Sequence, residues 1–181
     1  MKNMFKAFLM VVLALIITGC GASEETEEKE VEVIDEVSKY SRISTGELVE
    51  MMGEPEMTET WAKQTNNNGD FEVTTYGYDK DGMRYEFIIG EDAVARLSIY
   101  SNDYWNGEGE RFSYNKDSKV DTMDVFGVEW DDDAKTSVDN NTTYEIISVS
   151  DKIAHFMAGD IDTEDKTFGF AKVTYNVKYF D

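Results

Sequence analysis

Hydrophobic and polar positions divide the chain into three parts with different patterns. Positions 7–17 are apolar without interruption. Positions 21–36 hold seven Glu and one Asp, with few apolar residues among them. From position 40 onwards, short apolar runs alternate with turn-forming Gly, Asn and Asp residues, which is typical of a folded domain built from short elements. The pattern therefore predicts an apolar leader, an acidic spacer and one folded domain.

The folded part is predicted to begin with a helix of about two turns. Ser44 and Glu47 match a capping box, in which the hydroxyl and the carboxylate each satisfy a free backbone N–H. Leu48 begins a set of apolar residues at helical spacing. Gly53 and Pro55 are expected to end the helix, because glycine accepts positive φ and proline cannot continue the helix.

Three strands are predicted next, joined as an antiparallel meander. Positions 71–78 are rich in Val, Thr and Tyr, positions 83–89 alternate between apolar and polar residues, and positions 94–100 return as a third strand. Positions 79–82 and 90–92 carry the turn residues between them. The pattern therefore predicts an α+β domain, an antiparallel β-sheet meander with one or two short helices packed on one face.

The second half of the chain has a weaker pattern. Positions 101–110 form a polar loop, and strand-like segments follow at 142–148 and 152–157, with a long alternating segment at 167–179.

Two arrangements of this second half stay open. Thr-Thr-Tyr at 142–144 repeats Thr-Thr-Tyr at 74–76, and 121–127 loosely resembles the capped helix. The domain is therefore either one sheet extended by extra strands or two degenerate repeats, at about 40–101 and 115–181.

The first half of the domain resembles a known group of small lipoproteins. The segments 44–55 (STGELVEMMGEP), 74–79 (TTYGYD) and 84–87 (RYEF) are similar to the SmpA/OmlA and β-lactamase-inhibitor-like group. The resemblance covers about 44–100 and implies a short helix that ends in a Gly-x-Pro turn and packs on an antiparallel sheet. Members of the group act through protein–protein contacts, one branch in outer-membrane assembly and another in the inhibition of β-lactamases. The resemblance therefore implies a binding module, without a matched partner-contact residue.

The leader has the features of a secretion signal. Lys2 and Lys6 precede the apolar run, which is too short for a membrane-crossing helix of about 20 residues. The sequence Ile-Thr-Gly-Cys at 17–20 resembles the lipobox of bacterial lipoproteins, in which the cysteine receives a diacylglyceryl group. This resemblance implies that Cys20 is lipidated and becomes the mature N-terminus. The alternative is an ordinary cleaved signal with a chance cysteine.

These features give the expected domain organisation. Positions 1–19 are the secretion signal, 20–39 a lipidated, acidic, disordered tether, and 40–181 a single globular domain. The expected location is the extracytoplasmic face of a bacterial membrane, to which lipid on Cys20 anchors the protein.

Composition narrows the classes of partner. The chain has 38 Asp and Glu against 17 Lys and Arg, for a formal net charge of -21. Such a surface repels phosphate backbones, so no nucleic-acid partner is expected. The single cysteine excludes an intrachain disulfide.

Candidate catalytic and metal-binding chemistry is sparse. His155 is the only histidine and lies in an apolar run, and the sequence contains no nucleophile elbow, phosphate-binding loop or dinucleotide fingerprint. One histidine and one lipidated cysteine do not make a zinc site. We therefore predict no catalytic residue, no metal ligand and no cofactor.

Carboxylates provide two alternatives. Asp-x-Asp-Gly at 79–82 and the Asp triplet at 131–133 are oxygen donors that calcium prefers, although 79–82 is also a hairpin turn without the distal ligand of an EF-hand. A pair of carboxylates could instead hydrolyse cell-wall glycan. A calcium-stabilised surface protein and a carboxylate-dependent hydrolase are thus the alternative functions.

The aromatic pair Tyr104 and Trp105 lies within the polar loop and is the candidate binding site. Tyr and Trp carry much of the binding energy at protein interfaces, but the pair could also be a lid folded over the sheet. The sequence predicts a non-catalytic protein-binding module, with an envelope or extracellular protein as its partner.

Overall fold

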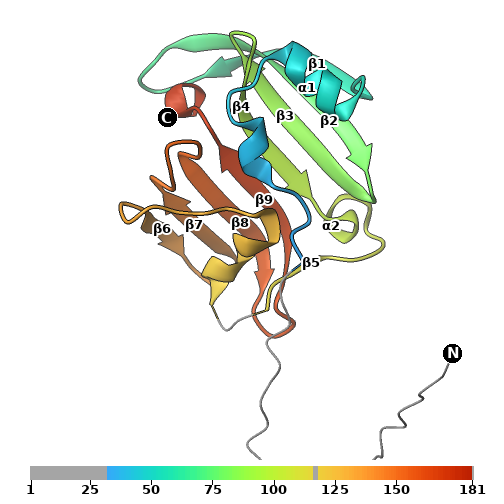
Figure 1. Ribbon diagram of the computed structural model, residues 1–181, viewed down its shortest axis with the longest axis vertical. Helices are drawn as coiled ribbons and strands as arrows, with labels where there is room; N and C mark the ends of the chain where they lie inside the picture. Colours follow the sequence, from blue (N-terminus) through green and yellow to red (C-terminus); the bar gives the residue numbers. More distant parts are fainter. Residues whose placement is uncertain (1–31, 116–117, 181) are drawn as a thin grey trace, which may run out of the picture.

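The computed structural model describes residues 32–115 and 118–180 and shows an α+β fold. Within these ranges, nine strands form one antiparallel sheet with short helical segments against it, as the sequence predicts (Figure 1). The predicted secretion signal at 1–19 and the predicted lipidation site, Cys20, lie outside the described residues. No helix in the described ranges is long and apolar enough to cross a membrane.

Two four-stranded meanders make up most of the sheet. The first consists of β1 (Met57–Gln64), β2 (Asp70–Lys80), β3 (Met83–Gly90) and β4 (Ala93–Tyr100), and the second of β6 (Lys135–Asp139), β7 (Thr143–Ile147), β8 (His155–Asp162) and β9 (Thr167–Thr174). They join where β4 pairs with β9, giving the order β1-β2-β3-β4-β9-β8-β7-β6, while the short β5 (Phe112–Ser113) also pairs with β9. The two meanders therefore occupy mirrored positions in one sheet.

Each meander is preceded by helical turns. α1 (Thr45–Met52) comes before β1, and the 3-10 turns η2 (Lys119–Thr122) and η3 (Asp124–Phe126) come before β6. The two Thr-Thr-Tyr sequences lie on β2 and at the start of β7, the second strand of each meander. The short sequence similarity between the halves thus falls on corresponding places in the sheet.

α1 has the predicted boundaries. The Ser44 hydroxyl accepts a hydrogen bond from the Glu47 backbone N–H at 3.3 Å, and the Ser44 N–H donates to the Glu47 carboxylate at 2.8 Å, so the capping box is complete. Leu48 is fully buried, and Gly53 closes the helix with a φ of 86°. The helix is therefore fixed at both ends by local signals.

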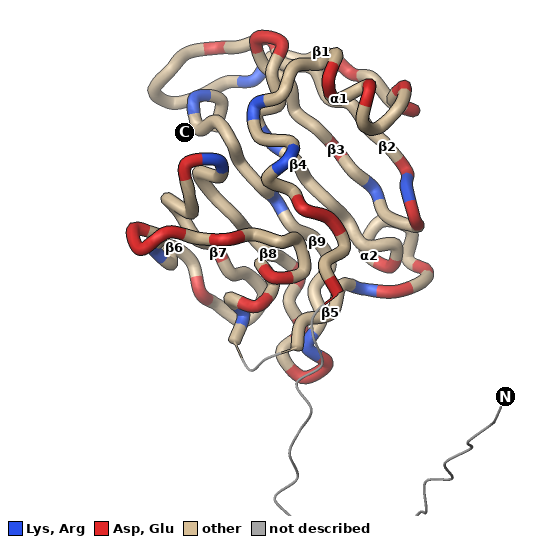
Figure 2. Tube along the Cα trace, in the orientation of Figure 1, with Lys and Arg blue, Asp and Glu red and all other residues tan. Residues whose placement is uncertain are grey.

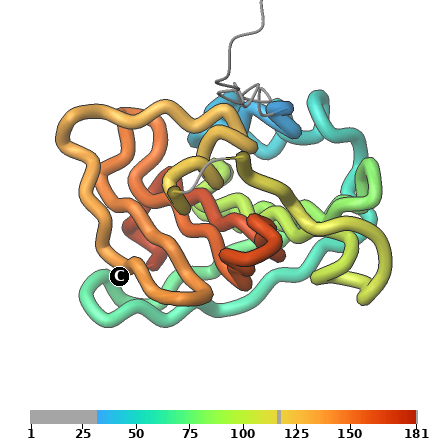
Figure 3. The backbone as a smooth tube through the Cα atoms, turned by 90° about the horizontal axis from the view of Figure 1, so that it is seen from below, coloured from blue at the N-terminus to red at the C-terminus, as the bar shows by residue number. Residues whose placement is uncertain are grey.

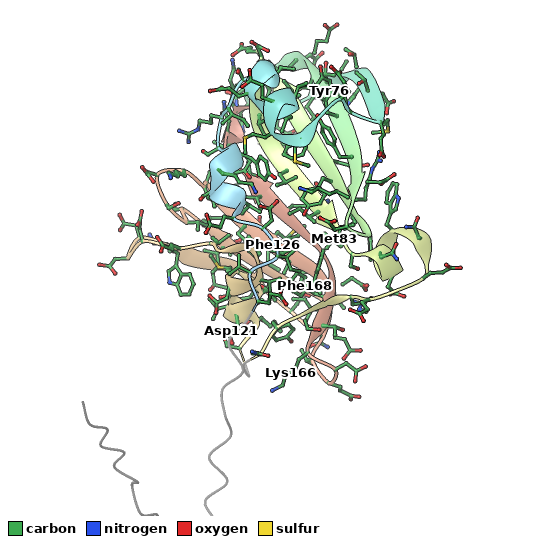
Figure 4. The ribbon with its side chains drawn as sticks, turned by 45° about the vertical axis from the view of Figure 1, so that its right-hand side comes forward. Tyr76, Met83, Asp121, Phe126, Lys166 and Phe168 are labelled. Atoms are coloured by element: carbon green, nitrogen blue, oxygen red, sulfur yellow. The ribbon has the colours of Figure 1, made fainter. Side chains whose placement is uncertain are left out.

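One face of the sheet carries the main core. α1, η2, η3 and the 3-10 turn η1 (Val37–Tyr40) all lie on this side, in front of the sheet in Figure 1. Large aromatic rings fill the space beneath them. Phe126 from η3 and Phe168 from β9 point toward each other, with ring centroids 6.1 Å apart (Figure 4). The helical turns thus cover the core formed by both meanders.

The packed part of the chain begins earlier than the sequence predicts. The predicted start is Tyr40, but residues before it already pack against the domain. The Ile34 N–H donates to the Val125 carbonyl at 2.9 Å, and Val37 is fully buried. The Tyr175 hydroxyl donates to the Val37 carbonyl at 2.7 Å. The predicted tether at 20–39 therefore extends too far, because Ile34 is hydrogen-bonded to Val125 and the Val37 side chain is buried in the domain.

Two strands and one turn differ from the sequence expectation. β1 and β6 have a strand neighbour on one side only and are mostly exposed, so they lack the apolar alternation that marks a strand in sequence. The segment predicted as one strand at 167–179 leaves the sheet after Thr174. There the Asn176 side chain accepts a hydrogen bond from the Lys178 N–H and caps η4 (Val177–Tyr179).

Candidate binding groove on the open face of the sheet

The face of the sheet away from the helical turns, here called the open face, is only partly covered. At one end, η4 folds over it, and Tyr179 packs with Val73 and Ala95 in a small second core. Nearby, Asn68 in the turn between β1 and β2 donates to the Lys178 carbonyl at 3.2 Å. Figure 3 shows the tip of this hairpin on the side of the sheet opposite η1. The hairpin and the C-terminal turn thus form one wall of the open face.

At the other end, the short helix α2 (Asn102–Asn106) lies over the sheet. The Ser101 hydroxyl caps it by accepting a hydrogen bond from the Tyr104 N–H at 3.3 Å, and Gly107 closes it in the left-handed conformation. The sequence predicts a polar loop at these positions. The helix is short and polar, so apolar periodicity does not reveal it.

The predicted binding residues, Tyr104 and Trp105, lie on α2. Their rings pack on the sheet, but they are also partly exposed to solvent. Tyr104 stacks on Tyr100 with a centroid distance of 5.9 Å and contacts Phe170 in a tilted arrangement at 5.1 Å, and Trp105 contacts Tyr100 at 5.6 Å. Yet the two side chains of α2 remain 44% and 45% exposed. We call these four rings, from Tyr100, Tyr104, Trp105 and Phe170, the aromatic patch. The patch therefore covers the sheet like a lid and also offers an exposed surface for binding, the two alternatives that the sequence left open.

Beneath the aromatic patch lies a buried charge that sequence reasoning placed on the polar face of its strand. Arg84 is only 5% exposed, and its guanidinium lies 5.2 Å from the Trp105 ring. One Nη donates to Asp79 at 3.1 Å. A Cβ on Gly77 would lie 2.1 Å from the other Nη, so the glycine makes room for the guanidinium. Glycine inside a strand is the signal that indicates such a close approach.

Between α2 and η4 the open face is hollowed into a central groove of about 360 Å³. Residues that define it come from β1, β2, β3, β4 and β9, and include Trp61, Thr75, Glu86, Arg96, Tyr100 and Lys172. The Trp61 indole N–H donates to the Thr75 hydroxyl at 2.9 Å, which fixes the ring at the β1 side. Tyr100 belongs to both the groove and the aromatic patch, so the two form a continuous surface.

Strand pairing explains why charged residues meet in the groove. Glu86, Ser98 and Lys172 are direct cross-strand neighbours on β3, β4 and β9. Arg96 lies two positions before Ser98 on the same strand, so it is diagonal to Lys172. The register thus brings two cations from different strands close together at the centre of the sheet.

Arg96 is held in a fixed orientation. Its Nε donates to the Thr174 hydroxyl at 3.0 Å, and the guanidinium lies 3.5 Å from the centre of the Phe180 ring. Burial lowers the pKa of Arg96 to about 10, so it stays charged at neutral pH. Burial also lowers the pKa of Lys172, and the Arg96 charge lowers it further. The two cations are therefore partly withdrawn from water.

The net charge of the whole chain is negative, at -21. Figure 2 shows Asp and Glu spread along the turns and loops at the periphery. Within the described ranges, no carboxylate lies within ion-pair distance of Arg96 or Lys172. The groove therefore holds two cations that make no ion pair among the described residues, beside the carboxylates of Glu59 and Glu86 that also line it.

The other candidates from the sequence do not converge into a site. The Nδ1 of His155 lies 4.0 Å from the Glu145 carboxylate on the open face. In the part of the chain that the structure describes, no group of three or more His, Cys, Asp or Glu side chains could hold a metal ion. The segment 79–82, predicted as a hairpin turn with calcium binding as the alternative, joins β2 to β3, and Asp79 pairs with Arg84.

Comparisons with known proteins identify no family. No family model matches the chain, and no curated protein matches it. A solved cysteine-rich secretory protein from Staphylococcus aureus has a TM-score of 0.43 and 6% identity, and covers 78% of this chain and 46% of its own. An extracellular protein containing an SCP domain from Bacillus anthracis has a TM-score of 0.42 and 9% identity, and covers 88% of this chain and 50% of its own. The chain thus spans about half the length of the solved structures it matches.

Proposed function

We propose that the protein is a lipid-anchored, extracytoplasmic binding module that holds a partner protein on the open face of its sheet. The observation that carries this proposal is the aromatic patch. Its two rings on α2, Tyr104 and Trp105, are about half exposed, and both contact the Tyr100 ring of the sheet. Large aromatic side chains held in place in this way are the residues that contribute most at protein interfaces.

Preorganisation supports a binding function for the patch. Side chains that are already ordered lose less conformational entropy when a partner binds. Tyr104 cannot collapse further onto the sheet, because its ring already contacts Phe170 and Gly169. A Cβ on Gly169 would lie 2.5 Å from the Tyr104 ring. The patch therefore offers a fixed apolar surface beside the polar groove.

The proposed location rests on the leader sequence. The charged start, the short apolar run and Cys20 at the lipobox position support export and lipid anchoring. The segment that follows Cys20 is rich in acidic residues, and anionic lipid headgroups repel its negative charge. We expect this segment to keep the domain away from the membrane, with the open face accessible.

An affinity capture experiment tests the proposal. The full-length chain, purified in a mild detergent, serves as bait against solubilised envelope of the native host, with mass spectrometry as the readout. We expect salt-resistant enrichment of a protein, and loss of that enrichment by at least tenfold in the Tyr104→Ala/Trp105→Ala variant. Trp130→Ala is the matched control, because Trp130 is 47% exposed but lies outside the aromatic patch. Enrichment that survives the double variant, or that is lost equally in the control, would contradict the proposal.

A further inference from the structure

The two cations of the central groove make no ion pair within the described ranges, although Glu145 acts on the charge of Arg96 and Glu86 on that of Lys172 from a longer distance. Arg96 uses its Nε for Thr174 and one ring face for Phe180. Within the described ranges, no acceptor lies within hydrogen-bond distance of its two Nη atoms. The Lys172 ammonium lies 5.3 Å from the Phe170 ring and has no carboxylate within 4.0 Å among the described residues. Partly buried cations are costly unless they are paired, so their arrangement points to an anionic ligand.

The geometry of Arg96 favours a planar anion. The hydrogen bond to Thr174 and the stacking on Phe180 fix the plane of the guanidinium, which leaves the Nη edge free to donate. A guanidinium edge matches the two oxygens of a carboxylate in a bidentate arrangement. Lys172 lies diagonally across from it and can donate to the same group.

The acidic surroundings exclude a polyanion. The chain has a formal net charge of -21, and both Glu59 and Glu86 line the same groove as the cations. A ligand with many phosphates or a run of carboxylates would be repelled by this surface. A segment with a single carboxylate can bind Arg96 and Lys172 through that group. If a residue beside the carboxylate is basic, its charge can lie near the glutamates of the groove.

The groove also has apolar walls. Trp61 lies on the β1 side and Tyr100 on the α2 side of the charged centre. The volume of about 360 Å³ lies near the low end of the range of about 300–1,000 Å³ that is usual for ligand pockets, which suits a short segment rather than a folded domain.

We infer that the central groove binds one carboxylate of an extended protein segment, with Arg96 and Lys172 as its ligands and Trp61 and Tyr100 against the flanking side chains. This inference rests on the proposed binding function and names the chemistry of the partner. The carboxylate belongs to an Asp or Glu side chain or to the C-terminus of the segment, and the residues beside it are apolar or basic.

Peptide selection tests the inference directly. A random heptapeptide display library is selected on the immobilised full-length chain, and the enriched peptides are synthesised for affinity measurements. We expect the enriched peptides to share one acidic residue or a free C-terminal carboxylate beside an aromatic or aliphatic residue. Replacing that acidic residue by its amide should weaken binding by about tenfold or more, because hydrogen bonds to charged groups are stronger than neutral ones.

Variants of the chain locate the contact. Arg96→Gln and Lys172→Gln should each lower affinity by about tenfold, and the change from carboxylate to amide should then have a smaller effect than it has with the parent chain. Lys172→Arg should retain binding. Lys152→Gln is the control, because Lys152 is an exposed lysine outside the groove, and its hydrogen bond from Ser41 involves its backbone carbonyl and not its side chain. Thermal unfolding of each variant separates lost binding from lost folding, and Lys172→Gln serves as the test if Arg96→Gln does not fold.

Other results of the peptide selection would overturn the carboxylate site, and some of them would also overturn the proposed function. Enriched peptides without an acidic residue, whose binding depends on Tyr104 and Trp105 but not on Arg96, would overturn the carboxylate site and leave the proposed function standing. Peptides whose binding is indifferent to both sets of residues, or no enrichment at all, would overturn both. Displacement of the peptides by millimolar inorganic phosphate, or binding of phosphatidylglycerol vesicles through Arg96, would assign the groove to phosphate instead.

Discussion

Single residues determine how the open face is built. Gly77 leaves the space in which the buried Arg84 lies, and Arg84 in turn lies beneath Trp105. The sequence alternation of β3 correctly predicts which residues face the core, but it places Arg84 on an exposed face. Periodicity cannot detect that α2 covers this end of the sheet, because that contact depends on a later part of the chain.

We predict that Gly77→Ala lowers the free energy of unfolding by about 1–2 kcal/mol. The new Cβ would lie 2.1 Å from an Nη of Arg84, which Asp79 and Trp105 hold in place. Urea denaturation followed by circular dichroism measures the change. Gly46→Ala is the control, since nothing lies within 4 Å of a Cβ there and the helix should gain about 0.5–1 kcal/mol. Equal stability of Gly77→Ala and the parent protein would contradict the packing of Arg84.

Buried tyrosines give the protein a dependence on alkaline pH. Burial raises the pKa of Tyr78 to about 12, and it also raises the pKa values of Tyr40, Tyr85 and Tyr175. The unfolded chain releases these protons near pH 10, whereas the native chain retains them. Their contribution to stability is therefore complete below pH 10 and is lost as the pH rises from 10 through 12.

Urea denaturation at pH 8, 10 and 11 tests this dependence, with phenolate absorbance as a second readout. We expect the free energy of unfolding to change little between pH 8 and 10 and to fall between pH 10 and 11. Phenolate absorbance should show some tyrosines that ionise only as the protein unfolds. Ionisation of all ten tyrosines near pH 10 without unfolding would contradict their burial.

Elements with local signals could be predicted from the sequence, and elements defined by their neighbours could not. The capping box of α1 and the turns that bound β2, β3 and β4 lie within a few residues of the structure they specify. β1 and β6 are exposed edge strands, and β9 occupies the centre of the sheet because of pairing with β4, far away in the chain. The alternation at 167–179 predicts that β9 is a strand, but it carries no information about the pairing of β9 with β4.

The segment before α1 acts as a strap across the core. Val37→Ala should lower the free energy of unfolding by about 1–3 kcal/mol, because Val37 is fully buried and its carbonyl accepts from Tyr175. Val33→Ala is the matched control, since Val33 is 47% exposed and should change stability by less than about 0.5 kcal/mol. Thermal or urea denaturation compares the two. Equal effects would place Val37 in the tether after all.

At the scale of the whole molecule, the two faces of the sheet have different roles. The covered face holds the main core, and the open face carries the proposed binding surface. The sequence suggested Tyr104 and Trp105 as binding residues from residue type alone. It held no sign of the Arg96–Lys172 pair, because the two residues come from strands that meet only through the β4–β9 register. A net charge of -21 also obscured a site whose central charges are positive.

Hydroxyl-radical footprinting of the full-length chain in solubilised native envelope, compared with buffer alone, tests the binding surface most directly. Tyr104, Trp105, Met51 and Trp130 are 44–47% exposed, so they are reporters of matched exposure. We expect oxidation of Tyr104 and Trp105 on the open face to fall in the envelope sample, while oxidation of Met51 on α1 and of Trp130 stays unchanged. Protection of Met51 and Trp130 with full oxidation of Tyr104 and Trp105 would show that the partner binds elsewhere and would contradict the account.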